Sequence, residues 1–140
     1  MRRVFVAILI PTTILLASCN LDAPCEDMAF GRLTSADRAV VRTNNMRDLR
    51  EITDAATIDK LTAFAISHAD NWETPIAGTP VAMLRVDFYS GNDFLGDFGL
   101  GSDFLSAQGC GFFQSRSVDP KDREALLQLF GVPDPYKSSS

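Results

Sequence analysis

Residues 81–100, VAMLRVDFYSGNDFLGDFGL, decide the fold because their first half alternates apolar and polar side chains. One side of an extended chain would carry Leu84, Val86 and Phe88. The other side would carry Arg85, Asp87 and Tyr89. Alternation of this kind is typical of a half-buried antiparallel strand. Gly91-Asn92 is a turn signal, so residues 94–100 are predicted to return as the second strand of a hairpin.

The segments on either side of this hairpin predict the remaining elements. Two short strands are predicted before it, at 38–43 and 46–52, and a further strand after it, at 110–118, with 104–107 as an additional short candidate. A helix is predicted over 55–68 and a second over 121–130. Thr53-Asp54 and Asp119-Pro120 supply the residue types that begin helices, and Gly131 one that ends them.

The element order is therefore β-β-α-β-β-β-α. We predict a two-layer α+β domain, with an antiparallel sheet of four or five strands and two helices on one face. The domain is expected over residues 34–131, followed by a flexible polar tail at 132–140. The whole chain of 140 residues has room for one such domain.

The first residues of the chain predict a secretory signal peptide. Met1-Arg2-Arg3 is followed by an apolar run over residues 4–16 and then by Ala17-Ser18-Cys19. A basic start, a short apolar core and small residues before a cut site define a signal peptide. The run is shorter than the roughly 20 apolar residues that a spanning helix needs.

Leu16-Ala17-Ser18-Cys19 resembles the lipobox of bacterial lipoproteins. The resemblance covers residues 1–19 and implies cleavage between Ser18 and Cys19, with diacylglyceryl and acyl (palmitate-type) chains on Cys19. Several acyl chains together anchor a protein stably to a membrane. Residues 19–33 would form the lipidated start and a tether. Asn20, in place of the Asp that retains Gram-negative lipoproteins at the inner membrane, points to the outer membrane, facing the periplasm. The alternatives are an ordinary secretory signal with a chance cysteine and an uncleaved anchor.

With Cys19 assigned to lipid, Cys25 and Cys110 remain as an even pair in an exported chain. Thiols usually oxidise in that setting, so we predict a disulfide between them. A loop of this length would stabilise the domain by about 3–5 kcal/mol. The alternatives are a pair of free thiols and a Cys25 that is too mobile to pair.

The charge pattern does not suggest nucleic-acid binding. Removal of the signal peptide, with Arg2 and Arg3, takes the formal charge from −5 to −7. Residues 51–119 contain ten acidic residues against three basic ones. Nucleic-acid binding would require clustered positive charge.

No motif for catalysis or a cofactor stands out. His68 is the one histidine, and its place near a helix end suggests contacts with the terminal carbonyls rather than catalysis. A zinc site would need more His or Cys ligands than the chain offers. Gly99-Leu100-Gly101-Ser102-Asp103 has the spacing of calcium-binding β-roll repeats, and Asp93, Asp97 and Asp103 could converge. A single copy does not make a β-roll, so no metal or cofactor is predicted.

Two aromatic residues are candidates for a binding surface. Trp72 follows the first predicted helix, and Tyr89 lies on the polar side of the alternating strand. Aromatic residues can anchor a partner, although Trp72 at a helix end is more typical of a residue that covers the core.

These observations favour a membrane-anchored envelope lipoprotein that binds a protein or an envelope component without catalysis. The alternative is an envelope hydrolase that uses carboxylates, with Asp54, Asp70 or Glu73 as candidates.

Overall fold

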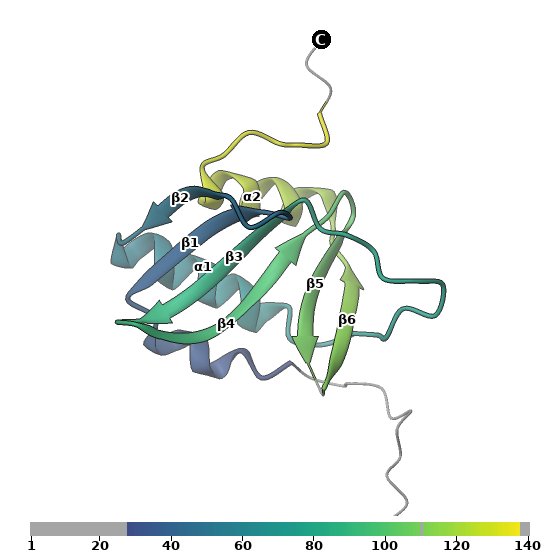
Figure 1. Cartoon of the computed structure of the whole chain (residues 1–140), viewed down its shortest axis with the longest axis horizontal. Coiled ribbons are helices and arrows are strands. Elements are labelled where there is room, and N and C mark those ends of the chain that lie inside the picture. The colour runs from purple at the N-terminus through teal and green to yellow at the C-terminus, as the bar shows by residue number, and fades with distance from the viewer. Residues whose placement is uncertain (1–27, 110, 138–140) are drawn as a thin grey trace, which may run out of the picture.

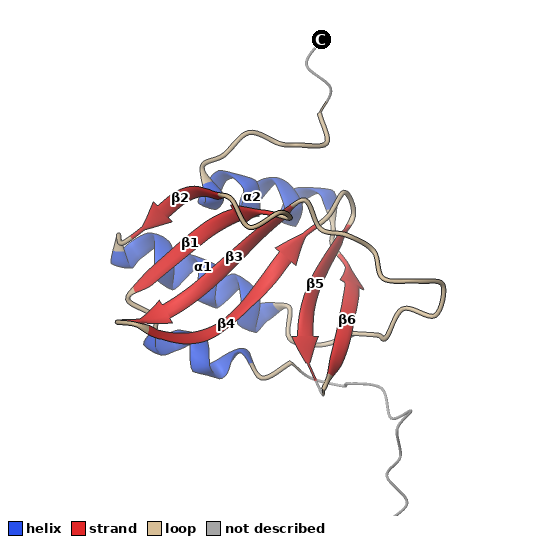
Figure 2. Ribbon diagram, viewed as in Figure 1, coloured by secondary structure: helices blue, strands red, loops and turns tan. Residues whose placement is uncertain are grey.

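The computed structural model describes residues 28–109 and 111–137. In order, the elements are η1 (Phe30–Ser35), β1 (Arg38–Thr43), β2 (Asp48–Ile52), α1 (Ala55–Ser67), β3 (Leu84–Ser90), β4 (Asp93–Leu100), β5 (Phe104–Gly109), β6 (Phe112–Ser117) and α2 (Pro120–Phe130). The strands form one antiparallel sheet in the order β2-β1-β3-β4-β5-β6. Both α-helices lie behind this sheet in Figures 1 and 2, so its other face is left open toward the viewer.

The predicted α+β class is confirmed, and the sheet has one strand more than the predicted order. The structure gives β-β-α-β-β-β-β-α, because the short candidate at 104–107 is a full strand, β5, paired along its length with β6. Its apolar signal is brief because only Leu105 and Ala107 face the core.

The alternation in β3 positions the core as predicted. Leu84, Val86 and Phe88 are all buried in the main cluster. Residues from both helices and from all the inner strands complete that cluster, among them Leu61, Leu126 and Phe130. Burial of this apolar area is the main force holding the helices to the sheet.

The segment expected to be a tether is part of the fold from Met28 onward. Residues 30–35 form a 3-10 helix, and Met28, Phe30 and Leu33 are buried in the core. The Phe30 ring meets Trp72 edge-on at 5.8 Å between ring centroids. The expectation of a tether reaching residue 33 is therefore wrong for residues 28–33, a segment too short for its apolar side chains to show a helical or strand period.

The tail is also held to the domain over its described part. Asp134 accepts two hydrogen bonds from Arg123 of α2, and the Tyr136 hydroxyl accepts one from the Met83 backbone N–H at 3.0 Å. Residues 134–136 thus pack against the domain, whereas a free polar tail was expected from residue 132.

The predicted helix ends are confirmed at three positions. The Asp54 carboxylate accepts hydrogen bonds from the backbone N–H and the hydroxyl of Thr57, at 2.8 and 2.6 Å. These bonds lower the pKa of Asp54. Asp119 begins α2 in the same manner, with Pro120 in the first turn, and Gly131 ends the helix in the left-handed conformation, at φ +62°.

The sheet is interrupted between β4 and β5. These strands pair only at Gly99 with Ser106 and at Leu100 with Leu105, next to the connection that joins them. Beyond Gly99, β4 continues along β3 while β5 continues along β6, and the two strands separate (Figure 2). The sheet therefore consists of a four-strand part and a two-strand part joined at one end.

Candidate functional site

The open face of the sheet carries a chain of alternating acidic and basic side chains. It runs across four strands, β2, β1, β3 and β4, through Asp48, Arg42, Asp87, Arg85 and Asp97. Antiparallel pairing sets Arg42 opposite Arg85, and Asp87 opposite Asp97, on neighbouring strands. The order of charges therefore follows from strand register, which places residues distant in sequence side by side.

The centre of this chain is tightly bonded. Asp87 is 1% exposed and contacts two arginines, with its Oδ2 2.7 Å from Arg42 Nη1 and its Oδ1 2.6 Å from Arg85 Nε. Arg42 also contacts Asp48 through Nε at 2.6 Å. A buried carboxylate is tolerated when it is paired and hydrogen-bonded in this way.

Asp97 ends the ion-pair chain, and its carboxylate forms fewer polar contacts than that of Asp87. Its side chain is 20% exposed, and its Oδ2 lies 3.1 Å from Arg85 Nε. Within the described residues its carboxylate accepts no hydrogen bond of good geometry. Burial raises the pKa of Asp97; the charge of Arg85 opposes that rise and the charge of Asp87 adds to it.

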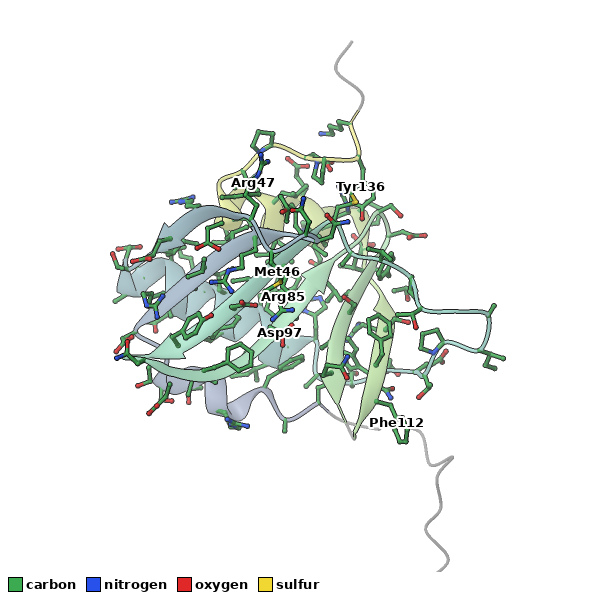
Figure 3. The ribbon with its side chains drawn as sticks, in the orientation of Figure 1. Met46, Arg47, Arg85, Asp97, Phe112 and Tyr136 are labelled. Atoms are coloured by element: carbon green, nitrogen blue, oxygen red, sulfur yellow. The ribbon has the colours of Figure 1, made fainter. Side chains whose placement is uncertain are left out.

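Asp97 lies at the edge of a pocket of about 280 Å³ on the open face. Figure 3 shows Arg85 and Asp97 together near the centre of this face, with Met46 nearby. The apolar part of the lining consists of Met46, Pro80, Val81, Ala82, Ala107 and Phe113. The polar part includes Ser106 and Gln108 from β5. Gly99 forms part of the floor, where a Cβ atom would overlap the Ser106 hydroxyl and come within 2.7 Å of the Ala82 Cβ.

A larger hollow of about 490 Å³ lies where β4 and β5 separate. Its walls are the first half of β4 and the end of the β5–β6 hairpin, and η1 contributes Phe30 and Leu33. Asp97 and Gln108 line both this hollow and the smaller pocket, so the two share a border. The separation of the strands thus gives Asp97 access from two sides.

A third, polar hollow of about 360 Å³ lies at the β6 side of the domain. Glu73 and Asp103 line it together with Arg116. Arg116 Nη1 donates to the Asp70 carboxylate at 2.9 Å and to the Asp70 carbonyl at 2.8 Å. Two of the predicted hydrolase residues, Asp70 and Glu73, are therefore near this hollow, whereas Asp54 is the cap at the start of α1.

Of the two aromatic candidates, one is on the open face and the other is not. Trp72 is only 2% exposed and donates from Nε1 to the His68 carbonyl at 2.7 Å, so its assignment to a binding surface is wrong. Tyr89 is half-buried on the open face, under the Arg38 guanidinium at 4.2 Å from the ring centroid. The exposed Phe94 meets the edge of this ring at 5.7 Å.

His68 lies at the end of α1, as predicted. Its Nδ1 is 2.8 Å from the Phe64 carbonyl oxygen and its Nε2 is 3.2 Å from Asp122 Oδ2. The side chain thus joins the end of α1 to the first turn of α2.

The calcium candidates lie in separate places. Asp93 begins β4, Asp97 lies within β4 on the open face, and Asp103 lines the polar hollow before β5. Over residues 28–109 and 111–137, no group of three or more His, Cys, Asp or Glu side chains gathers to hold a metal ion. Ser18, Cys19, Cys25 and Cys110 lie outside the described residues.

Only part of the ion-pair chain could be predicted from the sequence. Alternation in residues 84–89 places Arg85 and Asp87 on the polar side of β3. The partners Arg42 and Asp97 come from other strands, and only the register of the sheet shows that they meet.

Comparisons with protein-family models, with curated proteins and with solved structures found no match for this chain. None of the helices in the described part is long and apolar enough to cross a membrane.

Proposed function

We propose that this chain is a lipid-anchored protein of the bacterial envelope, favouring the outer membrane, which binds a protein or envelope component through the open face of its sheet. The observation that carries the binding role is the open face itself. The helices cover one face only, and the other carries the smaller pocket and an ion-pair chain, with the larger hollow adjoining at the gap between β4 and β5. Concave sites with apolar walls and a few polar groups are typical of binding.

Exposed apolar side chains surround this face. Met46 is 50% exposed and Val81 is 64% exposed, and both line the smaller pocket. Met46 has φ +65°, a left-handed conformation that non-glycine residues seldom adopt. An exposed, strained apolar residue next to a pocket supports a role in contact with a partner.

The anchor would keep the open face close to the membrane. Met28, where the described domain begins, lies nine positions after Cys19. Nine extended residues reach at most about 30 Å. The partner would therefore be an envelope protein or component within that range of the bilayer surface.

The anchor is tested by labelling cells that express the full chain with a radioactive or clickable fatty acid. The native chain is expected to take up label and to sediment with membranes. Cys19→Ser removes the thiol that would form the thioether, so its label should be lost. Cys25→Ser is the matched control and should stay labelled. Equal labelling of the Cys19→Ser variant contradicts the anchor.

The binding role is tested with a photo-crosslinking amino acid at one position on each side of the domain. Val81 on the open face is the test position, and Ile66 on α1, 44% exposed, is the matched control. Irradiation of intact cells is expected to give a discrete adduct at 81 and none at 66. The binding role is contradicted if both positions give the same adducts or neither gives any.

A carboxylate-dependent hydrolase is the second candidate function. It is favoured by one observation, that Glu73 and Asp103 line the same polar hollow. Two carboxyl groups in one cavity are the kind of pair that glycoside hydrolysis uses. The expected result is release of soluble fragments from envelope polysaccharide by the purified full chain, abolished by Glu73→Gln. No release by the native protein contradicts this candidate.

A further inference from the structure

The ion-pair chain on the open face has carboxylates at both ends. Its order is Asp48–Arg42–Asp87–Arg85–Asp97, with three carboxylates and two guanidinium groups. At one end, Asp48 is 63% exposed, so water screens its charge. At the other end, Asp97 is 20% exposed and lies against the pocket. Because acidic and basic groups alternate along this chain, the next group beyond Asp97, on the pocket side, would be a cation.

We propose that the pocket beside Asp97 binds a cationic group carried on a hydrocarbon stem, as in a lysine or arginine side chain of the partner, with Asp97 as the carboxylate that receives the charge. This inference rests on the proposed binding function and names the chemistry that the open face recognises. The shared chemistry is an ammonium or guanidinium on an aliphatic chain, whether it belongs to a protein or to a free amine.

The lining fits such a ligand in both its parts. Met46, Pro80 and Val81 provide an apolar wall for the stem, and Phe113 provides a ring on the β6 side. Lysine and arginine bury their methylene groups against surfaces of this kind while the charged end finds an acid. A volume of about 280 Å³ is enough for one long side chain.

The polar groups near Asp97 also favour a donor ligand. Ser106 and Gln108 line the pocket from β5 and offer oxygen acceptors. In the described part of the chain, no side-chain hydrogen bond is formed by either residue. Three oxygen-bearing side chains are thus available to a group with several N–H donors, such as an ammonium.

An anionic ligand is disfavoured by the same cluster. Arg85 already contacts Asp87 and Asp97 through its Nε, so its charge is shared between two carboxylates. An anion placed on Arg85 would lie beside Asp97 and be repelled by it. The overall formal charge of −5 adds to this preference for a basic partner.

The test uses calorimetric titration of the full chain in detergent at low ionic strength. The probes are Nα-acetyl-lysine N-methylamide, the uncharged Nα-acetyl-norleucine N-methylamide with the same backbone and a similar stem, and pentylamine. The lysine probe is expected to bind with a Kd of about 1 mM, at least tenfold more tightly than the norleucine probe. Equal binding of these two probes overturns the inference without need of any variant.

Two matched variants test whether Asp97 is the carboxylate that binds the cation. Asp97→Asn keeps the shape of the side chain and removes its charge, so it should weaken the lysine probe at least tenfold. Glu51→Gln removes an exposed carboxylate on β2 that is outside the ion-pair chain and should change the affinity less than twofold. Equal losses in the two variants overturn the assignment to Asp97. Circular dichroism and tryptophan emission check that both variants are folded.

The probes also separate the two sources of the cation. Binding of the lysine probe at least as tightly as pentylamine supports a protein side chain, because the capped backbone is then accommodated at the rim. Binding of pentylamine alone supports a free amine and overturns the protein side chain.

If no amine binds while the adduct at position 81 persists, only this inference fails and the binding function stands. If the adduct is absent while the lysine probe binds, the binding function fails instead.

Discussion

Arg123 and Asp134 form a forked ion pair that fastens the C-terminal segment to α2. Arg123 Nη1 donates to Asp134 Oδ2 at 2.8 Å, and Nη2 donates to Oδ1 at 2.7 Å. Both side chains are largely buried, at 12% and 8% exposed. Paired bonds between an arginine and a carboxylate are among the stronger polar contacts in proteins.

Asp134→Asn is expected to lower the free energy of unfolding by about 2 kcal/mol, because the charged half of this pair is lost. Chemical denaturation followed by circular dichroism measures the change. The control is Glu124→Gln, which removes an exposed contact to Lys137 at 3.9 Å and should change stability by less than about 0.5 kcal/mol. Equal effects of the two substitutions would contradict the role given to the fork.

The same pair predicts an acid dependence. The bonds from Arg123 lower the pKa of Asp134 to about 2, from its ordinary value of 3.8. Because the pKa is lower in the folded chain, the stabilisation is fully present above the ordinary value and is lost as the pH falls toward and through 2. The stability difference between the native chain and Asp134→Asn should therefore shrink between pH 4 and pH 2. A constant difference across this range is the contrary result.

Gly131→Ala is expected to destabilise the domain by roughly 1–2 kcal/mol, since an L residue at φ +62° is strained. The added Cβ would also overlap the Arg50 guanidinium, which donates to the Phe130 carbonyl at 3.1 Å. Gly31→Ala is the matched control, because nothing lies within 4 Å of its added Cβ and its φ is not positive. Thermal unfolding should separate the two variants clearly, and similar melting temperatures would argue against this account.

Trp72→Phe is expected to lower the unfolding free energy by about 2–3 kcal/mol. The substitution removes buried volume and the bond from Nε1 to the His68 carbonyl. Phe112→Leu, at a side chain that is 47% exposed, should change stability by less than about 0.5 kcal/mol. Denaturation followed by circular dichroism suits both variants, and a neutral Trp72→Phe would show that the indole bond contributes little.

The disulfide between Cys25 and Cys110 stays a prediction, with support from residues near both cysteines. Met28 lines the 490 Å³ hollow, and so do Gly109 and Gly111 on either side of position 110. Met28 lies three positions after Cys25, a reach of about 10 Å. Thiol counting on the denatured, unreduced chain should find neither cysteine reactive, and both reactive after reduction. Cys25→Ser should expose one thiol without reductant, and two reactive thiols in the native chain would exclude the bridge.

Local chemistry made much of the fold predictable. The hairpin over 81–100 follows from alternation and a Gly-Asn turn, and the helix ends follow from the capping residues Asp54, Asp119 and Gly131. The 3-10 helix at residues 30–35 could not be predicted, because its burial against Trp72 depends on contacts far apart in the sequence. The same holds for Asp97, which was a calcium candidate from its spacing and becomes the end of an ion-pair chain through strand register.

The two-residue junction between β4 and β5 has a mechanical consequence. The β5–β6 hairpin joins β4 through the pairs at Gly99 and Leu100, and the bridge between Glu73 and Ser115 holds its outer strand, so these few contacts set the width of the hollow. The chain enters the described domain at Met28, on the rim of that hollow. In a lipid-anchored protein, a pulling force from the membrane would enter the domain at this rim. Tension on the anchor and the shape of the binding face would then be coupled.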